Sequence, residues 1–126
     1  MLEDAITKTI KSISSKVYLG YLPENEATGI AVSTISTRSI PSLKRSDVRE
    51  REAIINIKIF GSHITEAKEI QHKLLRLFDS VKMNVEAPGY WYEMLIKVQN
   101  LNDMFIGQDK FSQLDISVHY YEHPIT

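Results

Sequence analysis

YWYEMLIKVQNLNDMFIGQDKFSQLDISVHYYEHP occupies residues 90–124, and its two alternating segments indicate the architecture of the chain. One side of each segment is apolar, and the side chains on that side are Tyr92, Met94, Ile96, Val98, Leu114, Ile116, Val118 and Tyr120. Polar residues lie between them, among them Glu93, Lys97, Gln113, Asp115 and His119. Because successive side chains of a strand point to opposite faces, the pattern predicts an antiparallel ribbon with one buried face. Residues 100–110 are predicted to form the loop between its strands.

Length and composition predict one domain that covers residues 1–126. Of the 126 residues, 43% are hydrophobic and 25% are charged, which is the usage of an ordinary globular domain with a single core. The formal net charge of −1 argues against a dedicated nucleic-acid binder, because phosphate contacts require a basic excess. We therefore expect no specific nucleic-acid recognition, and no stretch is apolar enough to suggest a membrane partner.

Two further features of the sequence narrow the possible chemistry and location. The chain contains no cysteine, which excludes a disulfide framework, a thiolate nucleophile and a cysteine-ligated zinc site. Its first residues, MLEDA, are acidic and lack the basic start and apolar run of a secretory signal. We expect a protein that is made and used in a cytosol.

Periodicity upstream of the ribbon predicts two helices and three strands. Apolar residues at steps of three and four predict helices at 2–13 and 67–81, the second with Ser62 or Thr65 as its N-cap. Strand formers predict strands at 17–22, 29–35 and 52–60. These elements include too few parallel crossovers for a doubly wound sheet. We predict an α+β fold, with an antiparallel β-sheet of about four to five strands and two helices packed on one face.

A polar segment at 36–47 is predicted to be a long exposed loop. It contains five hydroxyl side chains, three basic residues and one proline. Unstructured loops of this length are uncommon in small domains and often bind partners. Two interpretations are open, because the segment could contact a partner or could be a solvated connector whose charges keep it soluble.

The search for catalytic and metal-binding motifs gives no candidate. The histidines His63, His72, His119 and His123 form no dense ligand motif with a carboxylate, and no serine stands in a nucleophile elbow. No glycine-rich loop followed by lysine is present to bind phosphates. The acid pairs, Asp103 with Asp109 and Glu50 with Glu52, are more typical of a charged surface than of a catalytic cleft. We therefore predict a protein that is not an enzyme and has no cofactor.

An aromatic cluster at 90–92 is a candidate for contacts with other proteins, because large aromatic side chains bury much area with few rotors. If Tyr92 belongs to the core, alternation places Trp91 on the outer face of the sheet. Trp91 could then meet a partner, or it could cover the edge of the protein's own core, and both interpretations stay open.

The order of elements resembles the small tail-terminator or tail-completion proteins of long-tailed bacteriophages, which include head-tail joining and minor capsid proteins. The resemblance covers nearly the whole chain: the first helix, the strand at 17–21, the long loop, the strand at 54–60, the helix at 67–81 and the final ribbon. Its most suggestive motif is DMFIGQD at 103–109. This motif looks like the family's aromatic-aliphatic-glycine-x-acid turn before a last strand of the type x-L-D-I-S-V-x-Y.

The resemblance implies a ring, six-fold in the family, that caps the tail tube and docks to the head connector without catalysing a reaction. The implied partners are further copies of the chain, the tail-tube protein and the head-connector protein, with DNA able to pass through the ring. The implied location is the virion, and the host cytoplasm during assembly. The resemblance transfers no fixed contact residues, so we chose candidates by position and chemistry in the loop 38–47, the aromatic cluster and the turn 105–109. They are Arg38, Ile40, Leu43, Lys44, Arg45, Trp91, Met104, Phe105, Ile106 and Asp109.

Two rival interpretations lead to different tests. A bacterial adaptor or regulatory domain could bind a peptide on an edge of the same sheet, without any role in a virion. A small enzyme or nuclease could use Asp103, Asp109 and His119 with a divalent metal, although no ligand motif supports it.

Overall fold

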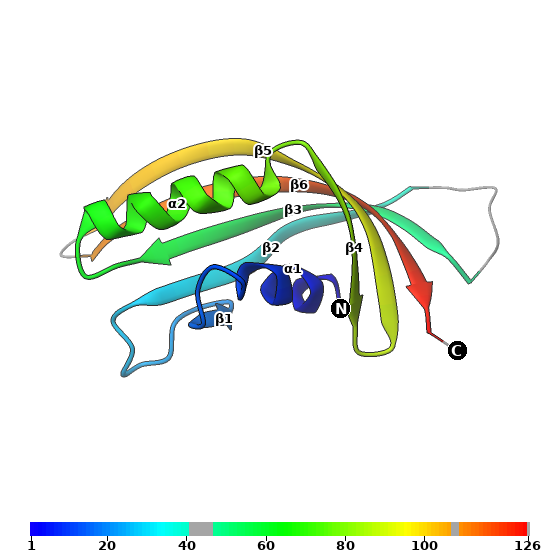
Figure 1. The fold of residues 1–126 in the computed structure, drawn as a ribbon, viewed down its shortest axis with the longest axis horizontal. Helices are drawn as coiled ribbons and strands as arrows, with labels where there is room; N and C mark the ends of the chain where they lie inside the picture. The colour runs from blue at the N-terminus through cyan, green and yellow to red at the C-terminus, as the bar shows by residue number, and fades with distance from the viewer. Residues whose placement is uncertain (41–46, 107–108, 126) are drawn as a thin grey trace.

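The computed structural model describes residues 1–40, 47–106 and 109–125, which form two helices and one six-stranded sheet (Figure 1). The elements in chain order are α1 (Leu2–Ile10), β1 (Val17–Leu19), β2 (Gly29–Ser39), β3 (Arg49–Phe60), α2 (Ile64–Phe78), β4 (Val81–Ala87), β5 (Tyr90–Ile106) and β6 (Asp109–Pro124). The α+β class and the two helices agree with the sequence-based prediction.

The sheet has the strand order β1-β2-β3-β6-β5-β4. Strands β1 and β2 run parallel, and the other four neighbouring pairs are antiparallel. The sequence analysis predicted four to five antiparallel strands, so it missed at least one strand. It also missed the parallel pair. The last strand in the sequence, β6, lies inside the sheet between β3 and β5.

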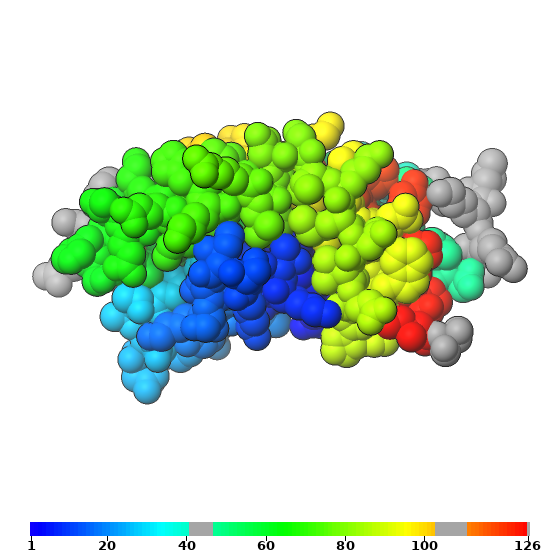
Figure 2. All heavy atoms as spheres, viewed as in Figure 1, coloured from blue at the N-terminus to red at the C-terminus, as the bar shows by residue number. Residues whose placement is uncertain are grey.

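Both helices cover the same face of the curved sheet (Figure 1). Four side chains of α1 are buried: Leu2, Ala5, Ile6 and Ile10. The atoms of α1 fill the space between α2 and the β4–β5 hairpin (Figure 2). From the sheet, fully buried Ile55, Ile57 and Ile59 of β3 join Leu114, Ile116 and Val118 of β6 in one hydrophobic core. The apolar side of the ribbon is thus the core side, as its alternation predicts.

Helix α2 is shorter at its C-terminus than the periodicity predicts. It ends at Phe78, because Asp79 is extended and Ser80 has a positive φ of 50°. Its N-cap is His63 rather than Ser62 or Thr65. The hydroxyl of Ser62 instead donates to the carboxylate of Glu66, 2.5 Å away.

Strand β4 is the element that the sequence analysis missed. Its inward residues Val81, Met83 and Val85 are half-buried, and the lysine, asparagine and glutamate between them are exposed. Apolar residues at 77, 78 and 81 continue the helical spacing, so residue 81 was assigned to the helix and residues 82–87 to no element. The turn at 88–89 joins β4 to β5, and Gly89 adopts a φ of 83° that favours glycine.

Parts of both predicted loops are strand. Strand β2 continues to Ser39 and pairs with β3, with Thr37 opposite Ala53, and strand β5 continues to Ile106, which pairs with Asp109. The polar residues of these segments suggested loops, but a strand on a partly solvated face can carry polar side chains as long as a neighbour supplies backbone partners. Residues 41–46 and 107–108 lie outside the described part of the chain.

The first predicted strand is also shorter than expected. Strand β1 stops at Leu19, because Gly20 takes a φ of 82° and the amide of Tyr21 donates to the carbonyl of Leu19. The chain therefore leaves the edge of the sheet after three paired residues.

Candidate interaction surface

One face of the sheet carries no helix, and we call it the open face (Figure 1). Register and alternation define its members on four strands. On β3 and β6 they are Glu50, Glu52, Ile54, Asn56, Lys58, Gln113, Asp115, Ser117, His119, Tyr121 and His123. On β5 and β4 they are Trp91, Glu93, Leu95, Lys97, Lys82, Asn84 and Glu86. The face combines charges of both signs with aromatic rings, and aromatic side chains are enriched where proteins contact one another.

Two open-face side chains, His119 and Tyr121, converge on the carboxylate of Glu50, and we call these three residues the Glu50 cluster. Glu50 Oε2 lies 2.7 Å from His119 Nε2, and the Tyr121 hydroxyl donates to the same oxygen at 3.2 Å. The pairing of β3 with β6 causes this arrangement, because it places Glu50 opposite Tyr121 and Glu52 opposite His119. The Glu50 side chain is only 14% exposed, so the two polar hydrogens compensate for its partial loss of water.

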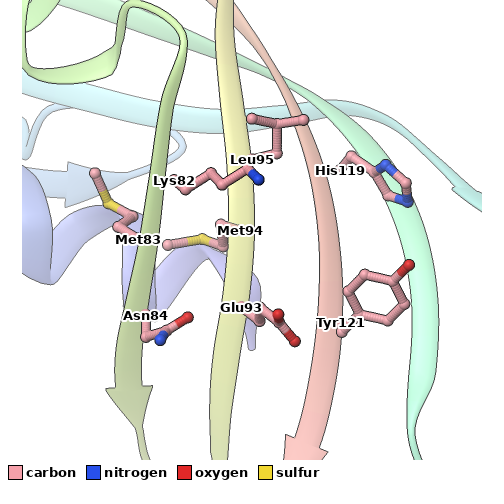
Figure 3. A pocket seen from close by; sticks show the side chains of 8 residues that line it. All are labelled: Lys82, Met83, Asn84, Glu93, Met94, Leu95, His119 and Tyr121. Atoms are coloured by element: carbon pink, nitrogen blue, oxygen red, sulfur yellow. The ribbon is translucent and has the colours of Figure 1, made fainter.

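A shallow depression of about 530 Å³ lies beside the Glu50 cluster (Figure 3). Its rim is formed by Lys82 and Asn84 of β4, Glu93 and Leu95 of β5, and His119 and Tyr121 of β6. Met83 and Met94 also line it, although their side chains point away from those of Glu93 and Tyr121 (Figure 3). An open hollow with both a lysine and a glutamate at its rim suits a side chain of a protein partner better than an enclosed small molecule.

Trp91 lies on the open face, as alternation predicts. Its indole stacks on the imidazole of His123 with ring centres 3.8 Å apart and planes 7° from parallel. His123 Nε2 lies 3.3 Å from Glu93 Oε1. The indole is half-buried by its own chain, so a partner protein would contact the edge of a stacked aromatic pair and not an isolated ring.

Other polar residues of the open face bond to one another. Asn56 donates through Nδ2 to Gln113 Oε1 at 3.1 Å and to Asp115 Oδ1 at 2.8 Å. Near the far end of β2, Arg38 pairs with Glu52 at 2.9 Å, although the arginine side chain is 74% exposed. Exposed pairs of this type contribute about 0–1 kcal/mol each to folding, so they fix the pattern of charge more than they stabilise the fold.

The predicted contact residues do not form one cluster. Arg38 ends up on β2, and Ile40 follows that strand and donates its amide to the carbonyl of Glu50. Leu43, Lys44 and Arg45 lie outside the described residues. The structure describes only the backbone of the second predicted group, with Met104, Phe105 and Ile106 on β5 and Asp109 on β6.

The two predicted groups lie at opposite ends of the sheet. Arg49, at the start of β3, pairs with Glu122, whereas Ile59 pairs with Ser112 near the start of β6. The end of β2 and the start of β3 therefore lie at one end of the sheet, and the end of β5 and the start of β6 lie at the other (Figure 1).

The sequence analysis did not identify the Glu50 cluster. The alternation of His119, Tyr121 and His123 on the polar side of β6 was a usable signal, because it placed three ring side chains on one face. The partner, Glu50, lies 69 residues from His119 in the sequence. Only the register between β3 and β6 brings them together, and no local pattern shows that register.

Two searches of the described residues are negative. They contain no group of three or more histidine, cysteine, aspartate or glutamate side chains placed to hold a metal ion. In the same part of the chain, no helix is long and apolar enough to cross a membrane.

Comparison with known proteins adds information on the fold only. No protein-family model matches the chain, and no curated protein matches it significantly. A solved structure, whose name states no function, is similar to it with a TM-score of 0.60 and 11% sequence identity. The match covers 94% of this chain and 89% of the other, so the arrangement of elements occurs in another protein over nearly its whole length.

Proposed function

We propose that this chain is a non-enzymatic virion assembly protein, a tail terminator or tail-to-head joining protein. In this role it forms a ring, with six copies as in the family it resembles, that caps the tail tube and docks to the head connector. Its partners are then other copies of itself, the tail-tube protein and the head-connector protein. It acts in the virion and, during assembly, in the host cytoplasm.

The observation that carries the proposal is the one-sided layering of the sheet. Two helices cover one face, and the open face and the two opposite ends of the sheet remain available for other proteins. A subunit of a ring needs at least two different contact regions, because each copy meets one neighbour on either side. It also needs contacts toward the tail and toward the head, and the opposite ends of the sheet supply separate regions for them.

The test is genetic and does not depend on any structural detail. Sequencing the DNA that flanks the gene comes first, and we expect neighbours that encode head-connector and tail-tube proteins. Inactivating the gene should then abolish infectious particles, and a plasmid copy should restore them. Antibody labelling of restored particles should mark the head-proximal end of the tail. Infectious particles that form without the protein and do not contain it would refute the proposal.

A second candidate, an adaptor that binds a bacterial peptide on a sheet edge, is favoured by one specific observation. Strand β4 is the last strand of the sheet, and β1 covers only part of β2, so both edges have backbone groups available to an added strand. Gene neighbours of bacterial regulation, together with a copurifying bacterial peptide, would support the adaptor and contradict the virion role.

A further inference from the structure

Strand β2 is longer than the strand that covers its outer edge. It spans 11 residues, but β1 pairs only with Ile30, Ala31 and Val32. The amide of Gly20 adds a last bond to the carbonyl of Val32, and the chain then turns away. Within the described residues, no strand pairs with positions 33–39 on that side. These positions include Ile35, whose side chain is 59% exposed.

The opposite edge of the sheet ends in β4, which is seven residues long and pairs with β5 on one side only. Four antiparallel steps separate β2 from β4, so the two strands have the same polarity within the sheet, although the curvature of the sheet turns β4 across the line of β2 (Figure 1). A second copy that places its β4 along β2 with the same polarity therefore meets β2 in parallel. Parallel pairing is what this edge of β2 already uses with β1.

One register matches the faces of the two strands along their whole overlap. With Ser36 opposite Asn84, both side chains lie on the open face, and Thr37 and Val85 both face the core side. The same register places Arg38 opposite Glu86. The arginine carries five donors and is bonded to Glu52 through one nitrogen, so it can also bond a second carboxylate. The bulge at Ile35 shifts the residues before it by one position relative to β4, so the faces of those residues match the faces of β4 as well.

We propose that residues 33–39 of β2 in one copy pair in parallel with β4 of the next copy, so that the sheets of neighbouring subunits become continuous. The inference rests on the proposed ring, because it names the surfaces by which the ring closes. The two edges are different surfaces, so the contact is heterologous, and heterologous contacts generate rings when the rotation closes.

Lys8 of α1 already bonds to the backbone of β4. Lys8 Nζ donates to the carbonyl of Glu86 at 3.1 Å in an exposed position. An edge lysine of this kind is a common protection against unwanted strand pairing. The incoming strand displaces it at small cost, because an exposed bond of this type contributes little.

Thiol cross-linking tests the register directly, because the natural chain contains no cysteine. The single variants Ser36→Cys and Asn84→Cys are tested alone and as a mixture, and the double variant carries both changes in one chain. Both positions are exposed. After oxidation at protein concentrations from micromolar to millimolar, the mixture should give a covalent dimer and the double variant a ladder of multimers. Each single variant alone should stay monomeric. Thr37→Cys mixed with Asn84→Cys is the matched control, since these side chains lie on opposite faces and should not cross-link.

Three outcomes would overturn the pairing. Asn84→Cys alone could form dimers, which would indicate that two β4 strands meet. The control pair could cross-link as well as the Ser36 pair, which would exclude this register. The third outcome is that no disulfide forms in any mixture, even in one that native mass spectrometry shows to be oligomeric. The last result refutes the edge contact and leaves the ring to the particle experiment, which depends on no particular surface.

Discussion

Truncating Ile57 is the most direct test of the fold, because the residue lies at the centre of the sheet. Its side chain is fully buried, and its cross-strand neighbours, Val32 and Leu114, are each 1% exposed. Ile57→Ala removes three carbon atoms from a site that cannot collapse, since both flanking strands are held in register by backbone bonds. Substitutions of this type cost about 2–5 kcal/mol, and these surroundings place the expected loss at about 3–4 kcal/mol.

The matched control is Ile54→Ala, which changes the same residue type on the same strand. Ile54 is half-buried on the open face, so its truncation should cost about 1 kcal/mol or less. Urea unfolding followed by circular dichroism measures both variants. With a slope of about 1.5–2 kcal/mol per molar urea, the midpoint should fall by about 2 M for Ile57→Ala and by about 0.5 M for Ile54→Ala. Equal losses for the two variants would refute the assignment of faces on β3.

Three further predictions concern buried polar groups. Gln71 on α2 is 6% exposed and donates to the carbonyl of Gln113 at 2.9 Å. Gln71→Ala should therefore lower the free energy of unfolding by about 1–3 kcal/mol. A thermal melt unchanged from wild type would contradict this role. The buried Oγ1 atom of Thr34 has no hydrogen-bond partner among the described residues. Thr34→Val should therefore leave the stability of the protein unchanged or raise it by up to about 1 kcal/mol in the same melt. A clear loss of stability would indicate that the hydroxyl has a partner. Burial, followed by the hydrogen bond to Glu122, raises the pKa of Tyr92, and burial raises that of Tyr120. Unfolded tyrosines ionise near pH 10, and folding raises the pKa of both side chains. The stability that they contribute is therefore full below pH 10 and is lost as the pH rises toward the raised pKa values, by up to about 1.4 kcal/mol per pH unit for each tyrosine. Tyr92→Phe should reduce this alkaline slope in urea titrations, and an unchanged slope would contradict the assignment.

Local patterns predicted the core of this fold well. The alternation of Met94, Ile96, Ile116 and Val118 indicated both the strands and their buried side, because burial on one face imposes a period of two. Helix α2 was equally clear from its apolar spacing. Side-chain periodicity is strongest where one face of an element is fully removed from water.

Prediction failed where pairing between distant segments decides the structure. Residues 36–39 are polar and residues 100–106 mix polar with apolar side chains, and both segments are strands because β3 and β6 supply backbone partners. Strand β4 was missed because Val81 fits the end of the helical pattern as well as the start of a strand. The Glu50 cluster depends on the register between strands that are far apart in the sequence, and no property of Glu50 or His119 alone indicates that register.

The interior position of β6 determines when the sheet can form during synthesis. Without residues 109–124, β3 lacks its second neighbour, and the strands divide into the group β1-β2-β3 and the hairpin β4-β5. Residues 109–124 therefore have to be synthesised before these two parts can be joined. Pairings across such long sequence separations fold slowly, and the unpaired edges stay exposed in the meantime. A fragment that ends before residue 109 should consequently be cut by proteases faster than a chain that contains β6.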